Sequence, residues 1–346
     1  MTQSSDDSLS VPPPVIPESE AIALASRHFG LSGNVARLTS ERDANFHLVT
    51  EQGEFVLKVS NPAEPALVTN LQTRALLHIA AVDPDLPVQR VVPNLTGSHE
   101  ETITGPGGQG MILRLFTYLP GLPLHKAERS VAQRRALGTA LARLGLALRG
   151  FFHPAAGHEL LWDIKHAARM RDLLPHIEEP ARRALVERIL DNFDRHVTPV
   201  LPKLRAQIVH ADFNPHNVLV AEDDHACVAG ILDLGDMVHT PLVNDLAIAA
   251  SYQLAQVGDP LSEAGDLIGA YHAVTPLEEI EIDLLYDLVG ARLATTAAIT
   301  SWRAARYPEN RDYILRNAPR AWAGLQAFAA LPRRDAQEKL RRICGI

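Results

Sequence analysis

The sequence predicts an α+β fold of two lobes, a small N-terminal lobe built on a sheet and a larger, mostly helical C-terminal lobe. Strand-like alternation recurs within the first 119 residues, whereas long amphipathic helical patterns follow them. The chain has 346 residues, 46% of them hydrophobic, which is enough to bury a core in each lobe. We expect a flexible tail over residues 1–17, the N-terminal lobe over residues 18–119 and the C-terminal lobe over residues 120–346.

The beginning of the chain, MTQSSDDSLSVPPPVIP, is polar and rich in proline. It lacks the basic stretch followed by an apolar stretch that is typical of secretion signals. This composition predicts a flexible segment rather than a packed element.

A short helix and three strands are expected next. Apolar residues recur at helical spacing from Ile22 to Phe29, and a glycine follows. The stretch VARLTSERDANFHLVTEQGEFVLKVS then predicts a strand, a loop, a second strand, a turn at Gly53 and a third strand. Alternation in the third strand places Lys58 on the same face as Val56.

The rest of the first lobe predicts a helix and a hairpin. EPALVTNLQTRALLHIAA carries Val68, Leu71, Ala75 and Ile79 at helical spacing, and the chain then reaches the strand MILRLFTYL through GPGGQG. Because no Lys-Ser or Lys-Thr follows these glycines, we read GPGGQG as a turn between strands and not as a phosphate-binding loop.

The second lobe begins after PGLPL. Its helical patterns are interrupted only from Val209 to about His239, and no internal repeat or charge block is present. We therefore expect helices around one short, strand-containing insertion.

That insertion carries the residues best suited to chemistry. VHADFNPHNVLV contains His210, Asp212 and Asn217, and a second apolar run ends at Asp233. A hairpin of this length would bring Asn217 and Asp233 together. Carboxylate and amide oxygens are hard ligands that suit Mg²⁺, and Asp212 could accept a proton nearby. The pattern predicts a phosphoryl-transfer site.

A phosphoryl-transfer site also needs a cation for the nucleotide phosphates. Lys58, in the middle of a strand, is the candidate, and Val56 on the same face could cover a purine. Each feature alone has a simpler explanation, since a mid-strand lysine is often a solvated edge residue and the His-Asp-Asn pattern is short. The complete series in this order favours the catalytic interpretation. We interpret His210 and His216 as structural hydrogen-bonding residues.

The sequence as a whole resembles the aminoglycoside phosphotransferase and choline kinase superfamily from about Ser40 to Leu315. Within it the likeness is greatest to the hydroxylysine kinases and to kinase modules fused to class III aminotransferases. The stretches that carry it are, in order, SERDANFHL, VLKVSNPAE, RLFTYLPGLPL, FFHPA, LLWDI, HADFNPHNVLV, GILDLGDM and YPENRDYIL. The resemblance implies a protein-kinase-like fold, with nucleotide bound by the N-terminal lobe and the catalytic loop and acceptor site in the C-terminal lobe.

The resemblance also implies roles for single residues. Asp212 would be the catalytic base, Asn217 and Asp233 would hold Mg²⁺, and Lys58 would contact the phosphates of ATP or GTP. The hinge FTYLPG would meet the base around Phe116, Thr117 and Leu119, with Leu219 and Leu232 as the floor beneath it. Asp245 would support the catalytic loop.

Three departures from the superfamily pattern stand out. Ala211 replaces a glycine between the histidine and the aspartate, which we interpret as a small change because alanine is nearly as compact. No glycine occurs between Ala36 and Gly53, so the phosphate-covering loop would be TSERDAN, with Ser40 and Asn45 and backbone amides. The helix position that usually gives Lys58 a glutamate partner is Gln72, which leaves that partner unknown.

An amine-bearing hydroxylated metabolite is the expected acceptor, with a hydroxylysine-like amino acid favoured over homoserine, choline or ethanolamine, and aminoglycosides. Asp236 and Asp163 could bind its ammonium group and Arg292 its α-carboxylate, with Trp162 and Trp302 as pocket walls. Asp163 and Trp162 could instead anchor a helix. Arg292 could instead be a surface charge or a structural salt bridge.

Composition restricts partners and compartment. The net charge of −8 disfavours nucleic acid and anionic membranes and suits a cationic acceptor. No apolar run is long enough to span a membrane, and the two widely separated cysteines give neither a disulfide framework nor a zinc pattern. We expect a cytoplasmic protein and leave a homo-oligomer open.

Two other functions compete with a kinase. His210, Asp212, His216 and Asp233 could form the ligand set of a metallohydrolase, which would leave Lys58 unexplained. A non-catalytic module could keep the fold and only bind nucleotide or a partner. A protein substrate is disfavoured because eleven residues separate Asp233 from Asp245, too few for a long activation segment.

Overall fold

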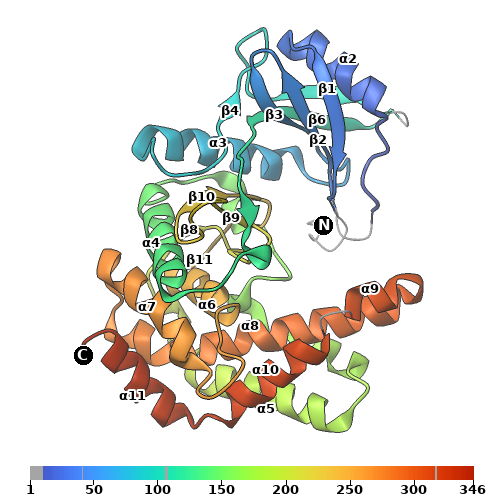
Figure 1. Cartoon of the computed structure of the whole chain (residues 1–346). Coiled ribbons are helices and arrows are strands. Elements are labelled where there is room, and N and C mark those ends of the chain that lie inside the picture. Colours follow the sequence, from blue (N-terminus) through green and yellow to red (C-terminus); the bar gives the residue numbers. More distant parts are fainter. Residues whose placement is uncertain (1–10, 41, 106–107, 316–317) are drawn as a thin grey trace.

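The structure is a computed structural model that describes residues 11–40, 42–105, 108–315 and 318–346, and it has two lobes (Figure 1). The predicted α+β class, with a small sheet lobe and a larger helical lobe, is confirmed. The small lobe consists of α2 (Glu18–Phe29), β1 (Gly33–Leu38), β2 (Ala44–Thr50), β3 (Gly53–Val59), α3 (Ala66–Val82), β4 (Val91–Val92), β5 (Glu101–Thr104) and β6 (Gly110–Thr117).

The sheet of the small lobe runs in the order β1-β2-β3-β6-β4, and β5 also pairs with β6. All of these pairings are antiparallel. The register places Lys58 of β3 between Asn45 of β2 and Arg114 of β6. Alternate apolar residues of these strands, including Phe46, Leu57 and Leu113, are fully buried in a core that α2 completes.

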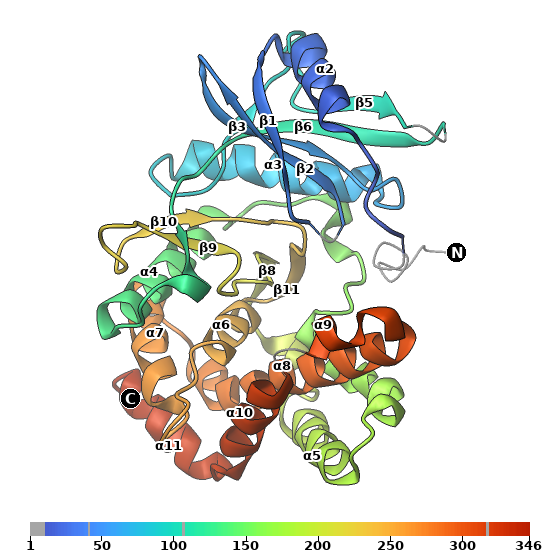
Figure 2. The ribbon, with the colours of Figure 1, turned by 45° about the vertical axis from the view of Figure 1, so that its right-hand side comes forward.

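Helix α3 lies between the sheet and the large lobe (Figure 2). Its buried residues Leu71, Ala75 and Ile79 belong to the core of the large lobe and not to the core beneath α2. A backbone hydrogen bond from Ile231 N to Pro87 O, at 2.7 Å, also joins the lobes. The small lobe is thus packed onto the part of the large lobe that carries the predicted catalytic residues.

The large lobe is mostly helical. Its helices are α4 (Val131–Ala147), α5 (Pro180–His196), α6 (Leu242–Ser251), α7 (Leu261–Val274), α8 (Glu279–Arg306), α9 (Arg311–Leu315), α10 (Ala318–Ala330) and α11 (Arg333–Ile343), with 3-10 turns η1 (Leu124–Lys126), η2 (Pro154–Gly157), η3 (Ile164–His176), η4 (Leu201–Lys203) and η5 (Pro308–Asn310). None of the helices described is long and apolar enough to cross a membrane.

Short strands interrupt these helices where the sequence predicted an insertion. They are β7 (Leu122–Pro123), β8 (Ala206–Val209), β9 (Val218–Val220), β10 (Val228–Ile231) and β11 (Val238–Pro241). One small sheet has the order β10-β9-β7, and β8 pairs with β11 in another. The antiparallel β9-β10 hairpin is the one predicted to join Asn217 to Asp233.

Local predictions in the small lobe mostly hold. Helix α2 ends at Gly30, whose φ of 67° is left-handed, so glycine is the natural stop there. Residues 106 and 107 of the GPGGQG segment lie outside the described residues; on either side of them, between β5 and β6, Gly105 N donates to Gln109 O at 2.8 Å. Residues 1–10 of the expected tail also lie outside them, but the tail does not extend to residue 17. Ile16 is buried, and Asn61 Nδ2 donates to the Val11 and Pro12 carbonyls.

Candidate active site

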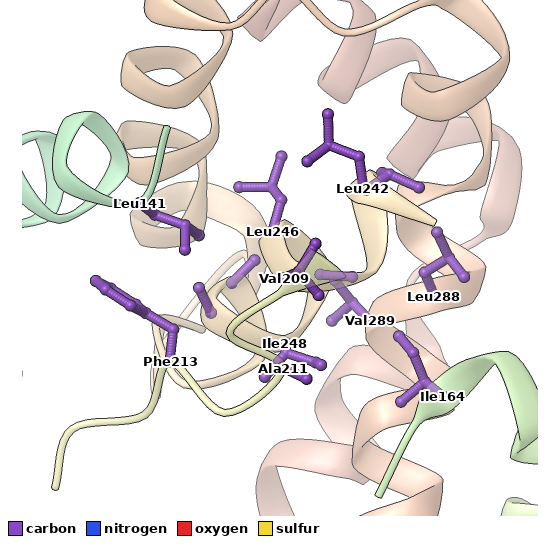
Figure 3. Close-up of a cluster of buried hydrophobic side chains, with 14 of the residues drawn as sticks. Leu141, Ile164, Val209, Ala211, Phe213, Leu242, Leu246, Ile248, Leu288 and Val289 are labelled. Atoms are coloured by element: carbon purple, nitrogen blue, oxygen red, sulfur yellow. The ribbon is translucent and has the colours of Figure 1, made fainter. Parts of the chain in front are cut away.

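The catalytic loop is fixed by apolar residues that alternate with its polar ones. Val209, Ala211 and Phe213 are buried in the core of the large lobe, among side chains from several helices (Figure 3). His210 is also fully buried and makes two hydrogen bonds with the backbone. Its Nε2 donates to Leu232 O at 2.9 Å, and its Nδ1 accepts from Asp212 N at 3.2 Å. With both ring nitrogens engaged, His210 is a structural residue, as predicted, and not a metal ligand.

The backbone of the catalytic loop takes an unusual conformation at Ala211. Its φ is 61°, in the left-handed region, which costs an L-residue on the order of 1 kcal/mol relative to glycine. Our interpretation of this position by side-chain size was therefore wrong, because the backbone angle is what favours glycine here. The Asp245 carboxylate of α6 offsets the strain by accepting from Ala211 N at 2.9 Å, which is the support implied for it.

Asp212 lies in a network of donors. One carboxylate oxygen, Oδ2, accepts from the side-chain amides of Asn214 and Asn217, each at 2.8 Å. The other, Oδ1, accepts from Arg292 Nη2 at 3.0 Å. Burial, with repulsion from the charge of Asp236, nevertheless raises the pKa of Asp212 to about 6, although Arg292 opposes the shift. The carboxylate is thus oriented and more basic than an ordinary aspartate.

This pKa predicts a pH dependence of activity. Only the ionised form of Asp212 can accept a proton, so kcat/KM should fall about tenfold per pH unit below about pH 6 and level off above it. Arg292→Gln should move the inflection to higher pH, because the guanidinium lowers the pKa of Asp212. Initial rates between about pH 5 and 8 would measure both. A flat profile over that range would rule out Asp212 as the titrating base.

Asn217 and Asp233 lie on facing ends of the β9-β10 hairpin, where Leu232 N donates to Asn217 O at 2.8 Å. The Asn217 amide nitrogen donates to Asp212 Oδ2 and to Asp212 O, which leaves its oxygen as an available ligand. Asp233 is solvent-exposed and has a left-handed φ of 58°. Loss of water around the carboxylate tends to raise its pKa. The positive charges of Lys58 and Arg42 outweigh this effect and lower the pKa. An ionised carboxylate beside an amide oxygen fits Mg²⁺.

The partner of Lys58 is Asp43, which the sequence did not identify. Lys58 Nζ lies 2.8 Å from Asp43 Oδ2, and the other Asp43 oxygen accepts from Asn61 N at 2.8 Å. Asp43 N in turn donates to Ser40 Oγ at 3.2 Å, so the ion pair belongs to the predicted phosphate-covering loop. Counting back from the turn at Gly53 places Asp43 diagonally opposite Lys58, and this register was the signal available in the sequence.

Gln72 has a different role from the glutamate it replaces. Its side-chain oxygen accepts from Arg114 Nη2 at 3.1 Å. Arg114 is buried, also donates to Thr69 O and stacks over Phe116 at 5.3 Å. Burial lowers the pKa of Arg114. A neutral amide therefore accepts a hydrogen bond from a buried arginine of β6, while the lysine of β3 pairs with the loop.

Four of the residues predicted to bind the base of the nucleotide are apolar side chains. Val56, Leu119 and Leu232 are partly buried and Leu219 is buried, and a methyl group added at Gly230 would touch both Leu119 and Leu219. The Leu119 and Leu219 side chains are therefore neighbours.

The hinge residues are less open to a ligand than predicted. The Phe116 side chain is buried in the core. Thr117 N donates to Arg90 O, and Thr117 O accepts from Gln89 Nε2. Among the hinge residues named, Leu119 is consequently the best candidate for a backbone contact with the base.

On the acceptor side, Asp236 pairs with Arg42 Nη1 at 2.9 Å. Asp163 is buried, accepts from Lys165 N and from Thr240 Oγ1, and lies 3.0 Å from Lys165 Nζ. These contacts identify it as a helix cap, so the predicted ammonium contact at Asp163 is not supported. The cap is the alternative left open by the sequence.

Arg292 is enclosed rather than exposed on its helix. Besides Asp212 it donates to Tyr252 OH at 3.0 Å and stacks on Trp162 at 5.2 Å. Because Arg292 is buried and pairs with Asp212, its contacts favour the structural salt bridge, the alternative left open by the sequence, over the predicted contact with an acceptor carboxylate. Trp302, partly buried farther along α8, stacks on Arg306 at 5.7 Å.

Comparison with known proteins identifies the family. The model of a phosphotransferase enzyme family matches residues 34–280 of this chain. The chain belongs to this family. It is 32% identical over 331 residues to hydroxylysine kinase of Danio rerio, covering 89% of this chain and 92% of that protein. It is 28% identical over 348 residues to hydroxylysine kinase of Mus musculus, covering 94% and 92%.

Solved structures support the same fold for this family member. A microcompartment-associated aminopropanol kinase superposes with a TM-score of 0.69 at 19% identity, covering 94% of this chain and 98% of that chain. An amicoumacin kinase in complex with AMP-PNP, Ca²⁺ and Ami gives a TM-score of 0.67 at 16% identity, covering 94% of each chain. The predicted membership of the aminoglycoside phosphotransferase group is confirmed, and so is the phosphotransferase class.

Proposed function

We propose that the protein transfers the γ-phosphoryl group of ATP or GTP, with Mg²⁺, to a hydroxyl of an amine-bearing metabolite, and that a hydroxylysine-like amino acid is the favoured acceptor. The observation that carries this proposal is the ionic contact between the lobes next to the predicted metal ligand Asp233. Arg42 of the small lobe lies 2.9 Å from Asp236 of the large lobe, and the charges of Lys58 and Arg42 lower the pKa of Asp233. Within the large lobe, Asn217 donates to Asp212 at 2.8 Å. The identity to hydroxylysine kinases over most of both chains supports the acceptor class.

Asp212 is the proposed base. The acceptor hydroxyl would bond to it, and the proton would pass to a carboxylate that Asn214, Asn217 and Arg292 hold in place. Lys58, oriented by Asp43, would hold the phosphates. Asn217 and Asp233 would hold Mg²⁺, which when bound supplies positive charge to the phosphate oxygens. Val56, Leu119, Leu219 and Leu232 would enclose the base, with Ser40 and Asn45 near the phosphates.

Asp236 is the proposed carboxylate for the ammonium group of the acceptor. It lies close enough to raise the pKa of Asp212, as expected for two groups around one bound molecule. Trp162 could form a wall of the same pocket, since it lies against Arg292. Homoserine, choline or ethanolamine, and aminoglycosides remain alternative acceptors with the same charged group. Two free cysteines, Cys227 and Cys344, fit the cytoplasmic location that we propose.

The competing functions are less well supported. Among the described residues, no group of three or more His, Cys, Asp or Glu side chains is arranged to hold a metal ion. Because both ring nitrogens of His210 are bonded to backbone groups, the metallohydrolase interpretation loses one of its four ligands. A non-catalytic module would not need an oriented base. Measured turnover of any acceptor would exclude this alternative.

The Lys58-Asp43 pair gives a direct prediction. Asp43→Asn should lower kcat/KM for the nucleotide by about 10 to 100-fold, because the loss of an orienting partner typically costs that much at a charged site. The acceptor KM should change little, since Asp43 lies on the nucleotide side. Asp85→Asn, on an exposed loop, is a suitable control. Steady-state kinetics with each substrate varied would test this, and an unchanged nucleotide kcat/KM would remove Asp43 from the site.

A nucleotide-consumption screen tests the proposed function. Mg-ATP and Mg-GTP would each be incubated with hydroxylated amino acids, amino alcohols and aminoglycosides, with neutral sugars as the control class. We expect consumption that depends on an amine-bearing acceptor and is greatest with 5-hydroxylysine. A neutral sugar as the best acceptor would refute the proposed substrate class while leaving the kinase activity intact.

A further inference from the structure

An ion pair joins the loop between β1 and β2 to the segment that follows Asp233. Arg42 Nη1 lies 2.9 Å from Asp236 Oδ1, and the two side chains are only 25% and 13% exposed. The pair connects the small lobe to the large lobe at the proposed active site. One of its members is the carboxylate assigned above to the acceptor, so that carboxylate already has a cation as its partner.

Arg42 lies among negative charges that surround the nucleotide side of the site. The charge of Asp236 raises the pKa of Arg42 most, burial opposes the shift, and Asp233 and Glu64 add to it. Arg42 thus interacts with the acceptor carboxylate and with a proposed ligand of Mg²⁺. It also belongs to the TSERDAN loop, which has no glycine to bring backbone amides close to phosphates. A guanidinium on this loop can supply the hydrogen-bond donors that such amides provide elsewhere.

The backbone of Arg42 is fixed while its side chain has a choice of partners. Asn61 Nδ2 donates to Arg42 O at 3.0 Å, and Asn61 N donates to the neighbouring Asp43, which holds Lys58. The loop is therefore held at the arginine and at the residue that follows it. A change of partner would need only side-chain rotation, because the anchored backbone already lies beside Lys58.

We propose that Arg42 is a shared cation that couples the two substrate sites. It bonds Asp236 when no nucleotide is present and turns to the triphosphate when nucleotide binds, which frees Asp236 for the ammonium group of the acceptor. This inference rests on the proposed function for the assignment of Asp236, whereas the part that concerns Arg42 and phosphate does not depend on the identity of the acceptor.

Charge complementarity favours this exchange. A triphosphate offers several anionic oxygens in the forked geometry that a guanidinium matches, whereas Asp236 offers one carboxylate. An Asp236 left without a cation at a site this enclosed would be unfavourable, and the acceptor ammonium removes that cost. Nucleotide should therefore raise the affinity for the acceptor, and by linkage the acceptor should raise the affinity for the nucleotide by the same factor.

The first test uses nucleotide alone. Titration calorimetry would measure Mg-AMP-PNP, Mg-GMP-PNP, adenosine and guanosine against the wild type, Arg42→Gln and Arg143→Gln. Arg143 pairs with Asp83 and also links elements of the two lobes, so it is a matched control away from the site. Arg42→Gln should lose about tenfold or more in affinity for the preferred triphosphate analogue and less than twofold for its nucleoside. Equal triphosphate affinities in Arg42→Gln and Arg143→Gln would overturn the proposal, and Arg42→Met, which also removes the charge, serves the same comparison if Arg42→Gln does not fold.

The second test uses 5-hydroxylysine with and without the preferred analogue. Wild type should bind 5-hydroxylysine about tenfold more tightly with the analogue present, which lies within the usual range of coupling factors. Arg42→Gln should bind it equally well in both conditions, and Asp236→Asn should bind it weakly in both. Coupling that persists in Arg42→Gln would contradict the proposal. If the wild type binds no 5-hydroxylysine, the proposed acceptor fails, and the triphosphate affinities alone then decide the role of Arg42.

Discussion

Asp212→Asn should reduce kcat by about 10² to 10⁴-fold, the usual contribution of a positioned general base, while the nucleotide KM changes by less than about threefold. The amide keeps the shape of the carboxylate but cannot accept the hydroxyl proton. It also fits the network poorly, because Arg292 donates to one oxygen and Asn214 and Asn217 donate to the other. Whichever way the amide turns, its NH₂ group faces a donor.

Steady-state kinetics with purified variants would measure this effect. Asp223→Asn, in the exposed turn between β9 and β10, makes the same chemical change outside the site and should retain full activity. Thermal unfolding of both variants would separate a loss of chemistry from a loss of fold. Turnover of Asp212→Asn within about threefold of wild type would remove Asp212 from its proposed role.

Asp233→Ala should raise the Mg²⁺ concentration needed for half-maximal activity by about 100-fold or more. Removal of a residue that only orients a metal ligand commonly costs 10 to 100-fold in metal affinity, and Asp233 is assigned as a ligand itself. Its carboxylate is held ionised by the charges of Lys58 and Arg42, so it is a charged ligand that the variant removes. We expect weaker binding of Mg-nucleotide because the metal ion loses this ligand.

Titration of Mg²⁺ at fixed nucleotide would test the metal assignment. Asp223→Ala is the matched control, because it removes a carboxylate from the same hairpin without touching the site. An apparent Mg²⁺ requirement equal to that of the wild type would show that Asp233 is not a ligand. A variant that loses activity at every Mg²⁺ concentration but still binds Mg-nucleotide normally would contradict the assignment as well.

The parts of the fold that depend on local pattern were predictable. Hydrophobic periodicity predicted the succession of strands along the chain in the small lobe, the helix containing Leu71 and the helical second lobe. The hairpin length placed Asn217 beside the strand that leads to Asp233, and the structure has that hairpin. Each of these depends on residues close in sequence, where turn chemistry and alternation restrict the choices.

The partners of the charged side chains were harder to predict. Arg292 pairs with Asp212 across 80 positions, and Arg42 pairs with Asp236 across 194, so no local pattern reports either contact. The role of Asp163 was equally hard to predict, because a buried helix cap and an exposed substrate contact can have the same local sequence. Ala211 is a further example, because the sequence identifies the side chain but does not report that the backbone φ is positive.

The measurement that tests the central claim most directly is the detection of the phosphorylated product. Purified protein, Mg²⁺ and the preferred triphosphate would be incubated with 5-hydroxylysine and the products followed by ³¹P NMR and mass spectrometry, beside Asp212→Asn and Asp223→Asn. We expect a phosphate monoester on the hydroxyl, formed in equal amount to nucleoside diphosphate by wild type and Asp223→Asn but not by Asp212→Asn. Release of inorganic phosphate without any phosphorylated acceptor from the whole amine panel would contradict the proposed activity.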